Sequence, residues 1–391
     1  MDALSLLQDL IRLPSVNPMG RDLPAGICLE SRVSDYLVDA LESLDVPHER
    51  IEVAPGRANV IARIDSPRAT RTILLDAHQD TVPVDGMTIE PFDPIIRDGR
   101  LYGRGACDVK GGIAAMLSAF ARLSRERPAG ASNVVLSCTC DEEHGQLGVS
   151  DLTQLWSDGK RRSTLLAAPP DVAIVAEPTE LDVVVAHRGA ARWMIRTTGR
   201  ACHSSNPTQG ENAIYKMAKV LSRLEDYAGT LAGRVTPHPL CGPATLSVGV
   251  ISGGVSVNTV PDECLIEVDR RCVPGEHGPS AIEDVGRYLR ENLNVDFEML
   301  PPWCIGLTLS DDDNGLIADE LLAHIAAIAG ERRKIGVPYG THASRFAAAG
   351  VPSVVFGPGS IAQAHTKDEW IEIEQLNQAA DVYYRLCASG G

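Results

Sequence analysis

Apolar residues in the first 183 positions follow two spacings that alternate along the chain. Leu4, Leu7 and Leu10 recur at helical spacing behind Asp2, a residue type that caps helices well. A second helix is predicted over 113–123, directly after a pair of glycines. Short continuous apolar runs, which are typical of buried strands, occur at 73–75, 134–136 and 173–176. This alternation of strands and helices predicts a mostly parallel sheet flanked by helices.

The pattern changes in the middle of the chain. Segments in which apolar and polar residues alternate predict longer strands over 193–198, 244–251 and 265–271. Helices near 212–226 and 281–292 give this part an α+β character. After Pro301 and Pro302 the first pattern returns, with a helix at 316–328, a strand at 353–356 and a final helix at 373–386. We therefore expect a discontinuous α/β domain, 1–183 and 301–391, and an inserted α+β domain, 184–300.

Composition and charge exclude some classes of protein. The 391 residues are 44% hydrophobic and 23% charged, as in an ordinary globular chain. A formal net charge of −16 disfavours nucleic acid and anionic membranes as partners. No apolar run approaches the roughly 18 residues of a membrane span, and the N-terminus lacks the basic segment of a signal peptide. Ten scattered cysteines without a Cys-x-x-Cys pair favour free thiols and a cytoplasmic location.

Candidate chemistry begins at the end of the first buried strand, with His78 and Asp80. Imidazole is a common metal ligand, and a neighbouring carboxylate can fix its tautomer, although such a pair also occurs in ordinary loops. Asp108 lies in the glycine-rich segment 103–112. That segment has neither the Gly-x-Gly-x-x-Gly nor the Walker spacing of a phosphate-binding loop. No partner base is evident that would make Cys107 a nucleophile.

Three more polar groups follow predicted strands of the same sheet. Glu142 and Glu143 would point to opposite faces of a straight strand, but at a turn both can reach one site. Glu177 follows the 173–176 strand, and His365 comes after the strand at 353–356. Each group alone could be a solvated turn. Together, two imidazoles and three carboxylates at strand ends suit two Zn²⁺ ions with one bridging carboxylate.

With these motifs in order from His78 to Glu369, the chain resembles the dinuclear zinc amidohydrolases, the family of acetylornithine deacetylase, succinyl-diaminopimelate desuccinylase, aminoacylase and carboxypeptidase G. The resemblance implies two Zn²⁺ ions, for which Co²⁺ is expected to substitute. One ion would be bound by His78, Asp108 and Glu177, and the other by Asp108, Glu143 and His365. It also implies that Asp80 orients His78, that Glu142 is the general base, and that the peptide bond after Asp108 is cis.

The inserted domain resembles the dimerisation, or lid, domain of this family. Its segment Gly199–Ser205 is similar to the motif whose histidine crosses a dimer interface. The resemblance therefore implies a homodimer in which His203 stabilises the oxyanion in the partner's active site. Arg271 is the candidate clamp for a substrate carboxylate, although an ion pair with Asp269 on the same strand face is an alternative.

Further candidate substrate contacts are Asn258, Arg188 and the loop that contains Gly340 and Thr341. His342 follows this pair at a place where relatives often carry an acid or a small polar residue. Specificity cannot therefore be transferred directly from the relatives at this position.

The implied activity is metal-dependent hydrolysis of the amide bond of an N-acyl amino acid or short peptide that has a free carboxylate. A zinc-bridged hydroxide would attack the carbonyl, with Glu142 as general base. The segment 357–365 is closest to acetylornithine deacetylases, which act in arginine biosynthesis, and desuccinylases or broader aminoacylases and carboxypeptidases are the alternatives. A non-catalytic relative would be expected to lack a ligand or the base. A mononuclear zinc peptidase would need His-Glu-x-x-His, which does not occur.

Overall fold

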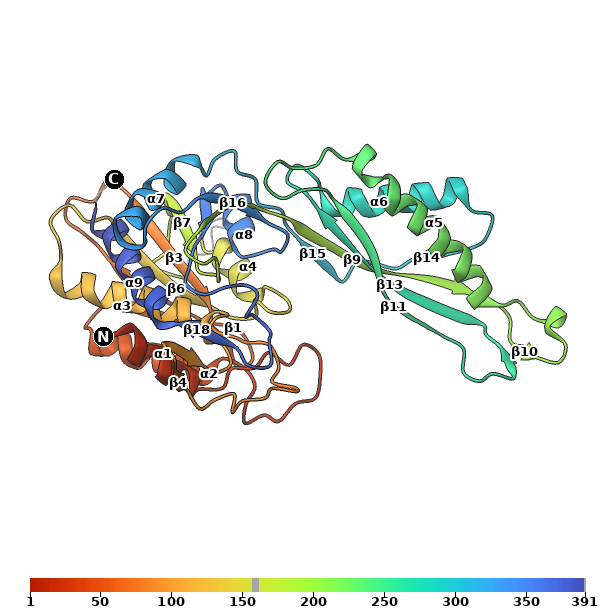
Figure 1. The fold of residues 1–391 in the computed structure, drawn as a ribbon, viewed down its shortest axis with the longest axis horizontal. Coiled ribbons are helices and arrows are strands. Elements are labelled where there is room, and N and C mark those ends of the chain that lie inside the picture. Colours follow the sequence, from red (N-terminus) through yellow and green to blue (C-terminus); the bar gives the residue numbers. More distant parts are fainter. Residues whose placement is uncertain (157–161, 390–391) are drawn as a thin grey trace. The chain divides into compact units, whose positions relative to one another are not determined.

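A twisted sheet of mixed direction, built from both ends of the chain, forms the centre of one part of the molecule in the computed structural model, which describes residues 1–156 and 162–389 (Figure 1). Its strand order is β1-β2-β6-β3-β7-β17-β8-β16. The bounds are β1 His48–Ala54, β2 Arg57–Ile64, β3 Thr72–His78, β6 Asn133–Thr139, β7 Val172–Val175, β8 Val183–His187, β16 Lys334–Val337 and β17 Ser353–Val355.

The middle of this sheet contains parallel pairs. β3 pairs in parallel with β6 and β7, and β17 pairs in parallel with β7. The pairs β1–β2, β2–β6 and β17–β8 are antiparallel. The predicted α/β class is confirmed, but the sheet also contains antiparallel pairs. One reason is local: only Pro55 and Gly56 separate β1 from β2, and so short a link joins antiparallel strands only.

The helices of this part have the bounds α1 Ala3–Ile11, α2 Ser31–Ser43, α3 Lys110–Glu126, α4 Leu147–Gln154, α7 Gly315–Ala329, α8 Ala343–Ala348 and α9 Ile373–Ala388. Asp2 caps α1 as the sequence predicts, since its carboxylate accepts a hydrogen bond from the Ser5 amide at 2.9 Å. Side chains of α1, α2, α3, α7 and α9 share one apolar core with alternate residues of β3 and β6.

Close packing of α3 explains the pair of glycines at its start. A Cβ on Gly112 would lie 2.6 Å from the Cβ of Ala176, and one on Gly111 would lie 2.5 Å from the carbonyl oxygen of Ala106. The other side of the sheet is covered differently, because α4 and α8 pack together and α8 contacts β7 and β17. A small separate sheet has the order β18-β5-β4, with bounds β4 Ile95–Arg97, β5 Arg100–Tyr102 and β18 Trp370–Glu372.

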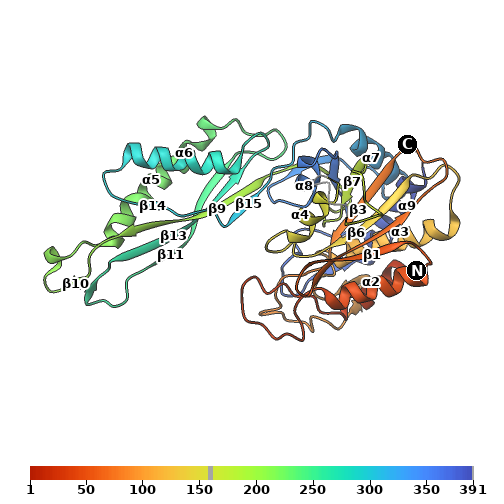
Figure 2. The same ribbon diagram turned by 180° about the vertical axis from the view of Figure 1, so that it is seen from behind.

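A second, antiparallel sheet has the order β11-β13-β9-β14, and β15 also pairs with β9 (Figure 2). The bounds are β9 Gly189–Thr198, β11 Thr245–Gly253, β13 Glu263–Cys272, β14 Glu298–Met299 and β15 Cys304–Gly306. Helices α5 Ala213–Arg234 and α6 Gly278–Asn292 pack against it around Trp193 and Tyr227, which are buried. A short ladder joins β10 Cys202–His203 to β12 Thr259–Val260, and the 3-10 helix η1 spans Pro207–Gln209.

Within the described residues the chain divides into two compact units. The catalytic unit consists of Met1–Val185, Asp311–Ile335 and Thr341–Gly391, and the inserted unit of Ala186–Ser310 and Gly336–Gly340. The sequence places the boundaries at 183/184 and 300/301. The inserted unit extends ten residues further, because β15 pairs with β9 and the Leu309 amide pairs with the His187 carbonyl.

In residues 1–156 and 162–389, no helix is both long and apolar enough to cross a bilayer.

Candidate active site

The candidate metal ligands lie at one edge of the catalytic unit's sheet. His78 is the last residue of β3, Glu143 follows β6, and Glu177 follows β7. Because β3, β6 and β7 are parallel, their carboxyl ends bring these side chains to the same edge. Potential ligand atoms of His78, Asp108 and Glu143 all lie within 4.8 Å of one another.

The Asp108 carboxylate lies between two imidazoles. Its Oδ1 is 3.1 Å from Nε2 of His78, and its Oδ2 is 3.3 Å from Nε2 of His365. The same His365 nitrogen is 3.3 Å from Oε2 of Glu143. One carboxylate thus has each oxygen directed at a different histidine, which is compatible with a ligand that bridges two metal ions.

Glu177 belongs to the same electrostatic cluster. Its side chain is buried, and desolvation followed by the negative charge of Asp108 raises its pKa well above the ordinary value. Burial and Asp108 likewise raise the pKa of Glu143 to about 8. Hydrogen bonds to Asp108 and Glu143 raise the pKa of His365 to about 10. The cluster therefore holds protons that a bound cation would displace.

The donor set fits divalent metal ions. Three carboxylates and two imidazoles are the ligand types of dinuclear hydrolytic sites. Among the described residues, Oε1 of Glu143 is buried without a hydrogen-bond partner, and such an atom is costly unless a ligand satisfies it. The residues present are therefore compatible with the group that the sequence implies.

A buried glutamate holds the backbone around Asp108. Glu369 accepts hydrogen bonds from the amides of Gly105, Cys107 and Asp108 at 2.8–2.9 Å, and it pairs with Arg104 at 2.7 Å. The Asp108–Val109 peptide bond is cis, as the family resemblance implies. Sequence reasoning assigned no role to Glu369, because its partners are more than 260 positions away.

Asp80 orients more than one group. Its backbone carbonyl accepts from Nδ1 of His78 at 2.9 Å, whereas its Oδ1 is 3.7 Å from that nitrogen. The carboxylate instead accepts from the backbone amides of Glu142 and Glu143, at 3.0 and 3.1 Å, and from the Asn17 side chain at 2.9 Å. Asp80 thus fixes both His78 and the turn that carries the two glutamates, but through different atoms.

Behind this turn lies a second buried polar cluster that sequence reasoning missed. Arg57 pairs with Glu30 at 2.9 Å and with Asp141 at 2.7 Å, and Asn17 also donates to Asp141. Burial, followed by the charge of Asp80, raises the pKa of Glu30 to about 8 despite the nearby Arg57 guanidinium. Isolated polar residues in separate loops gave no signal that they would meet.

In the inserted unit, two predicted residues lie close together. His203 pairs with Thr259 in the β10–β12 ladder, and the Ser204 amide donates to the Asn258 carbonyl at 3.0 Å. Both side chains are exposed, and Nδ1 of His203 is 2.7 Å from the Ser205 hydroxyl.

Three of the other predicted substrate contacts already have partners within the chain. Arg271 pairs with Asp269 at 3.1 Å, which is the alternative that the strand pattern left open. Arg188 donates to the Cys241 carbonyl at 2.8 Å. Gly340 ends the inserted unit, and the buried Thr341 begins the last segment of the catalytic unit, where its hydroxyl accepts from the Ala343 amide.

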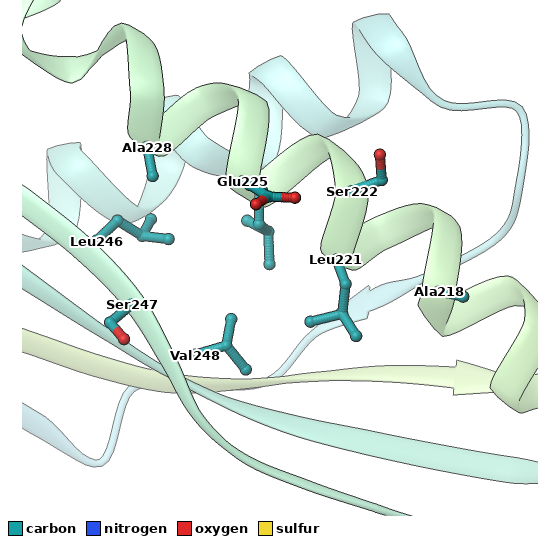
Figure 3. A pocket seen from close by; sticks show the side chains of 9 residues that line it. Ala218, Leu221, Ser222, Glu225, Ala228, Leu246, Ser247 and Val248 are labelled. Carbon is teal, nitrogen blue, oxygen red and sulfur yellow. The ribbon is translucent and has the colours of Figure 1, made fainter.

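The inserted unit also carries an apolar groove of about 560 Å³ between α5 and the edge strand β11. Figure 3 shows Leu221 of α5 directed toward β11, whose Leu246 and Val248 line the same groove. Along β11 most side chains are exposed, including those of Val250 and Ile251.

The chain is similar to known proteins along most of its length. The model of "Peptidase family M20/M25/M40" matches residues 74–389. An acetylornithine deacetylase from Myxococcus xanthus is 32% identical, with 90% of each chain covered. A succinyl-diaminopimelate desuccinylase from Corynebacterium glutamicum is 29% identical over 97% of this chain and 95% of its own.

Among solved structures, an M20 metallo-carboxypeptidase from Sulfolobus solfataricus superimposes with a TM-score of 0.77. The two sequences are 20% identical, and the superposition covers 100% of this chain and 99% of the carboxypeptidase. The family match spans most of the chain, and the two relatives cover 90% and 97% of it. The chain belongs to peptidase family M20/M25/M40, whose members are metal-dependent hydrolases of amide and peptide bonds.

Proposed function

We propose that this enzyme hydrolyses the amide bond of an N-acyl amino acid, with N-acetylornithine as the first candidate substrate. The observation that carries the proposal is the Asp108 carboxylate between His78 and His365, beside the Glu142–Glu143 turn. The similar acetylornithine deacetylase supports the choice of acyl group. The similar desuccinylase makes N-succinyl-diaminopimelate the second candidate.

The metal ions in this proposal are two Zn²⁺. His78, Asp108 and Glu177 would hold one, and Asp108, Glu143 and His365 the other. Such ions would supply Lewis acidity and would lower the pKa of a bound water toward neutral pH. Two Zn²⁺ would also offset the charge of the clustered carboxylates, so that the site can accept an anionic substrate.

Glu142 acts in this proposal as the general base and acid. It removes a proton from the attacking water and returns a proton to the leaving amine. Burial raises its pKa, which suits a carboxyl that must both accept and release a proton. The backbone hydrogen bond to Asp80 keeps Glu142 in the turn next to Glu143. Arg271 and Asn258, with Arg188, Gly340 and Thr341, are the proposed contacts to the substrate carboxylate and acyl group.

The proposed assembly is a homodimer that pairs the edge strand β11 and helix α5 of two inserted units. An exposed edge strand beside an apolar groove would be shielded by a second copy. His203 would then donate to the oxyanion in the partner's active site.

Replacing Leu221 with Lys should shift the sedimentation coefficient from dimer to monomer, whereas Leu316→Lys, at an 89% exposed position, should not. A monomeric wild type would overturn the assembly.

The activity is tested with a panel of N-acetylornithine, N-succinyl-diaminopimelate and other N-acyl amino acids. After chelation, the protein should lose all amide hydrolysis and regain it with Zn²⁺ or Co²⁺. N-acetylornithine should give the highest kcat/KM. If no substrate in the panel is cleaved in a metal-dependent way, the proposed function is wrong.

The proposed place of the reaction is the cytoplasm, in arginine biosynthesis. All ten cysteines lie in the described residues and are free thiols, which is compatible with a reducing compartment.

A further inference from the structure

The Glu142 side chain is contacted by a residue that the sequence analysis did not single out. Nε2 of Gln146 donates to Oε1 of Glu142 at 3.3 Å. An amide can donate this hydrogen bond but cannot take up the proton, so it can hold a carboxylate without competing for its chemistry. The contact engages one carboxylate oxygen and leaves Oε2 to exchange the proton.

The backbone of the turn places Gln146 for this contact. Asp141 and Gln146 both have left-handed φ angles, of 64° and 55°, and they bracket the segment that carries Glu142. Gln146 is also the N-cap residue of α4, and its carbonyl accepts from the Ser150 hydroxyl at 2.7 Å. The spacing of four residues between Gln146 and Glu142 therefore arises from a turn and not from a helix.

Arg345 of α8 determines which way the Gln146 amide faces. Its Nε donates to Oε1 of Gln146 at 3.2 Å. Because a guanidinium only donates, the carbonyl end of the amide must face Arg345, and its NH₂ end must face Glu142. Because an ionised carboxylate only accepts, both contacts favour the same orientation of the amide, and loss of either one weakens that preference.

Helix α8 is itself fixed to the strand that ends in His78. His342, directly before α8, lies with its Nδ1 2.9 Å from Oδ2 of Asp76, a fully buried residue of β3. The Ser137 hydroxyl donates to the same carboxylate at 2.5 Å. These contacts thus fix the position of Arg345 relative to β3, the strand that carries the proposed metal ligand His78. Through Arg345 they also fix the position of Gln146.

We propose that Gln146 and Arg345 form a relay that positions Glu142 for proton transfer, with Arg345 orienting the amide and the amide holding Oε1. This inference rests on the proposed role of Glu142 in the reaction. Gln146 and Arg345 are positioning residues, since the relay acts on the substrate only through Glu142.

The kinetic test uses Gln146→Met, which keeps the length of the side chain and removes the donor. We expect kcat to fall about tenfold, as for loss of a hydrogen bond to a charged group, while KM and bound metal stay unchanged. Arg345→Met should lower kcat as well, and Arg345→Lys, which can still donate, should restore part of it. The double variant should be no slower than Gln146→Met, because both changes break one relay. Unchanged kcat in Gln146→Met, or independent multiplication of the two effects, would overturn the proposal.

A matched control exists in α9. Nε2 of Gln378 donates to Oε1 of Glu374, also at 3.3 Å and with the same separation of four residues, but on an exposed face. Gln378→Met should leave kcat unchanged. A loss of kcat in this control equal to that in Gln146→Met would show that the effect is not specific to Glu142.

A second measurement is independent of activity. The chain has eight glutamines, so their side-chain amides can be resolved by NMR after selective ¹⁵N labelling. Gln146→Met assigns the Gln146 signal, which should shift in both Arg345→Met and Glu142→Ala while the Gln378 signal stays in place. If the Gln146 signal responds to neither change, the relay does not exist, whatever the enzyme hydrolyses. Failure of the substrate panel with an intact NMR response would instead count against the proposed function alone.

Discussion

The two units differ in how completely their sheets are buried. In the catalytic unit, β3 and β6 are buried along almost their whole length, and helices pack on both sides. In the inserted unit, β9 alternates between buried and partly exposed residues, and the edge strand β11 is largely exposed.

This difference in burial suits the two units to different functions. A sheet buried on both faces can offer functional side chains only at its ends, and there the desolvated carboxylates of Asp108, Glu143 and Glu177 converge. A sheet that leaves an edge and a groove open offers a surface for another chain. We therefore expect the proposed chemistry in the catalytic unit and the proposed assembly in the inserted unit.

The largest expected effect comes from the base of the catalytic unit. Glu142→Gln should lower turnover roughly 10²–10⁴-fold, because an amide cannot accept the proton. Bound metal, measured by elemental analysis, should remain normal, since Glu142 is not among the proposed ligands. Glu374→Gln, an exposed change on α9 of the same unit, is the control and should retain full activity. A Glu142→Gln enzyme as active as the wild type would remove Glu142 from the mechanism.

The next prediction concerns the proposed action of His203, in the inserted unit, on the active site of the partner. His203→Ala should lower turnover about 10²–10³-fold, as for loss of one oxyanion donor. Mixing inactive Glu142→Ala chains with His203→Ala chains should then restore about a quarter of the wild-type rate, since half of the dimers are mixed and each has one complete site. Each variant alone, treated in the same way, is the control. If subunit exchange is demonstrated and no activity returns, His203 does not act in trans.

The smallest expected effect concerns stability and pH. The pKa of Glu30 is raised to about 8 from 4.5, so its contribution to folding is present below pH 4.5 and is lost as the pH rises through 8. Glu30→Gln removes this dependence and keeps an acceptor for Arg57. Its stability relative to the wild type should therefore grow between pH 5 and 8.5, by roughly 2–4 kcal/mol.

Urea unfolding at the two pH values measures this change. Glu52→Gln, at an exposed position of β1, is the control and should leave the pH dependence as it is. A constant difference between Glu30→Gln and the wild type at both pH values would mean that Glu30 is ionised throughout.

Much of the local structure follows from the order of apolar residues. The predicted helix over 113–123 lies within α3, and the strand at 73–75 lies within β3. The helix predicted near 212–226 continues to Arg234, because Tyr227 and Leu231 extend its buried face beyond the charged Asp226. Apolar spacing specifies such elements because residues of one face lie three or four positions apart in a helix and two positions apart in a strand.

The sequence by itself indicated where strands end, which polar residues follow them and which acid lies in the glycine-rich segment. It thus predicted His78, Asp108, Glu143, Glu177 and His365 as one candidate set. Only the tertiary structure decided what holds them. Glu369 supports the backbone at Asp108 from more than 260 positions away, and Arg345 reaches Gln146 across 199. No local spacing encodes such contacts, because they depend on how the whole chain returns to one edge of the sheet.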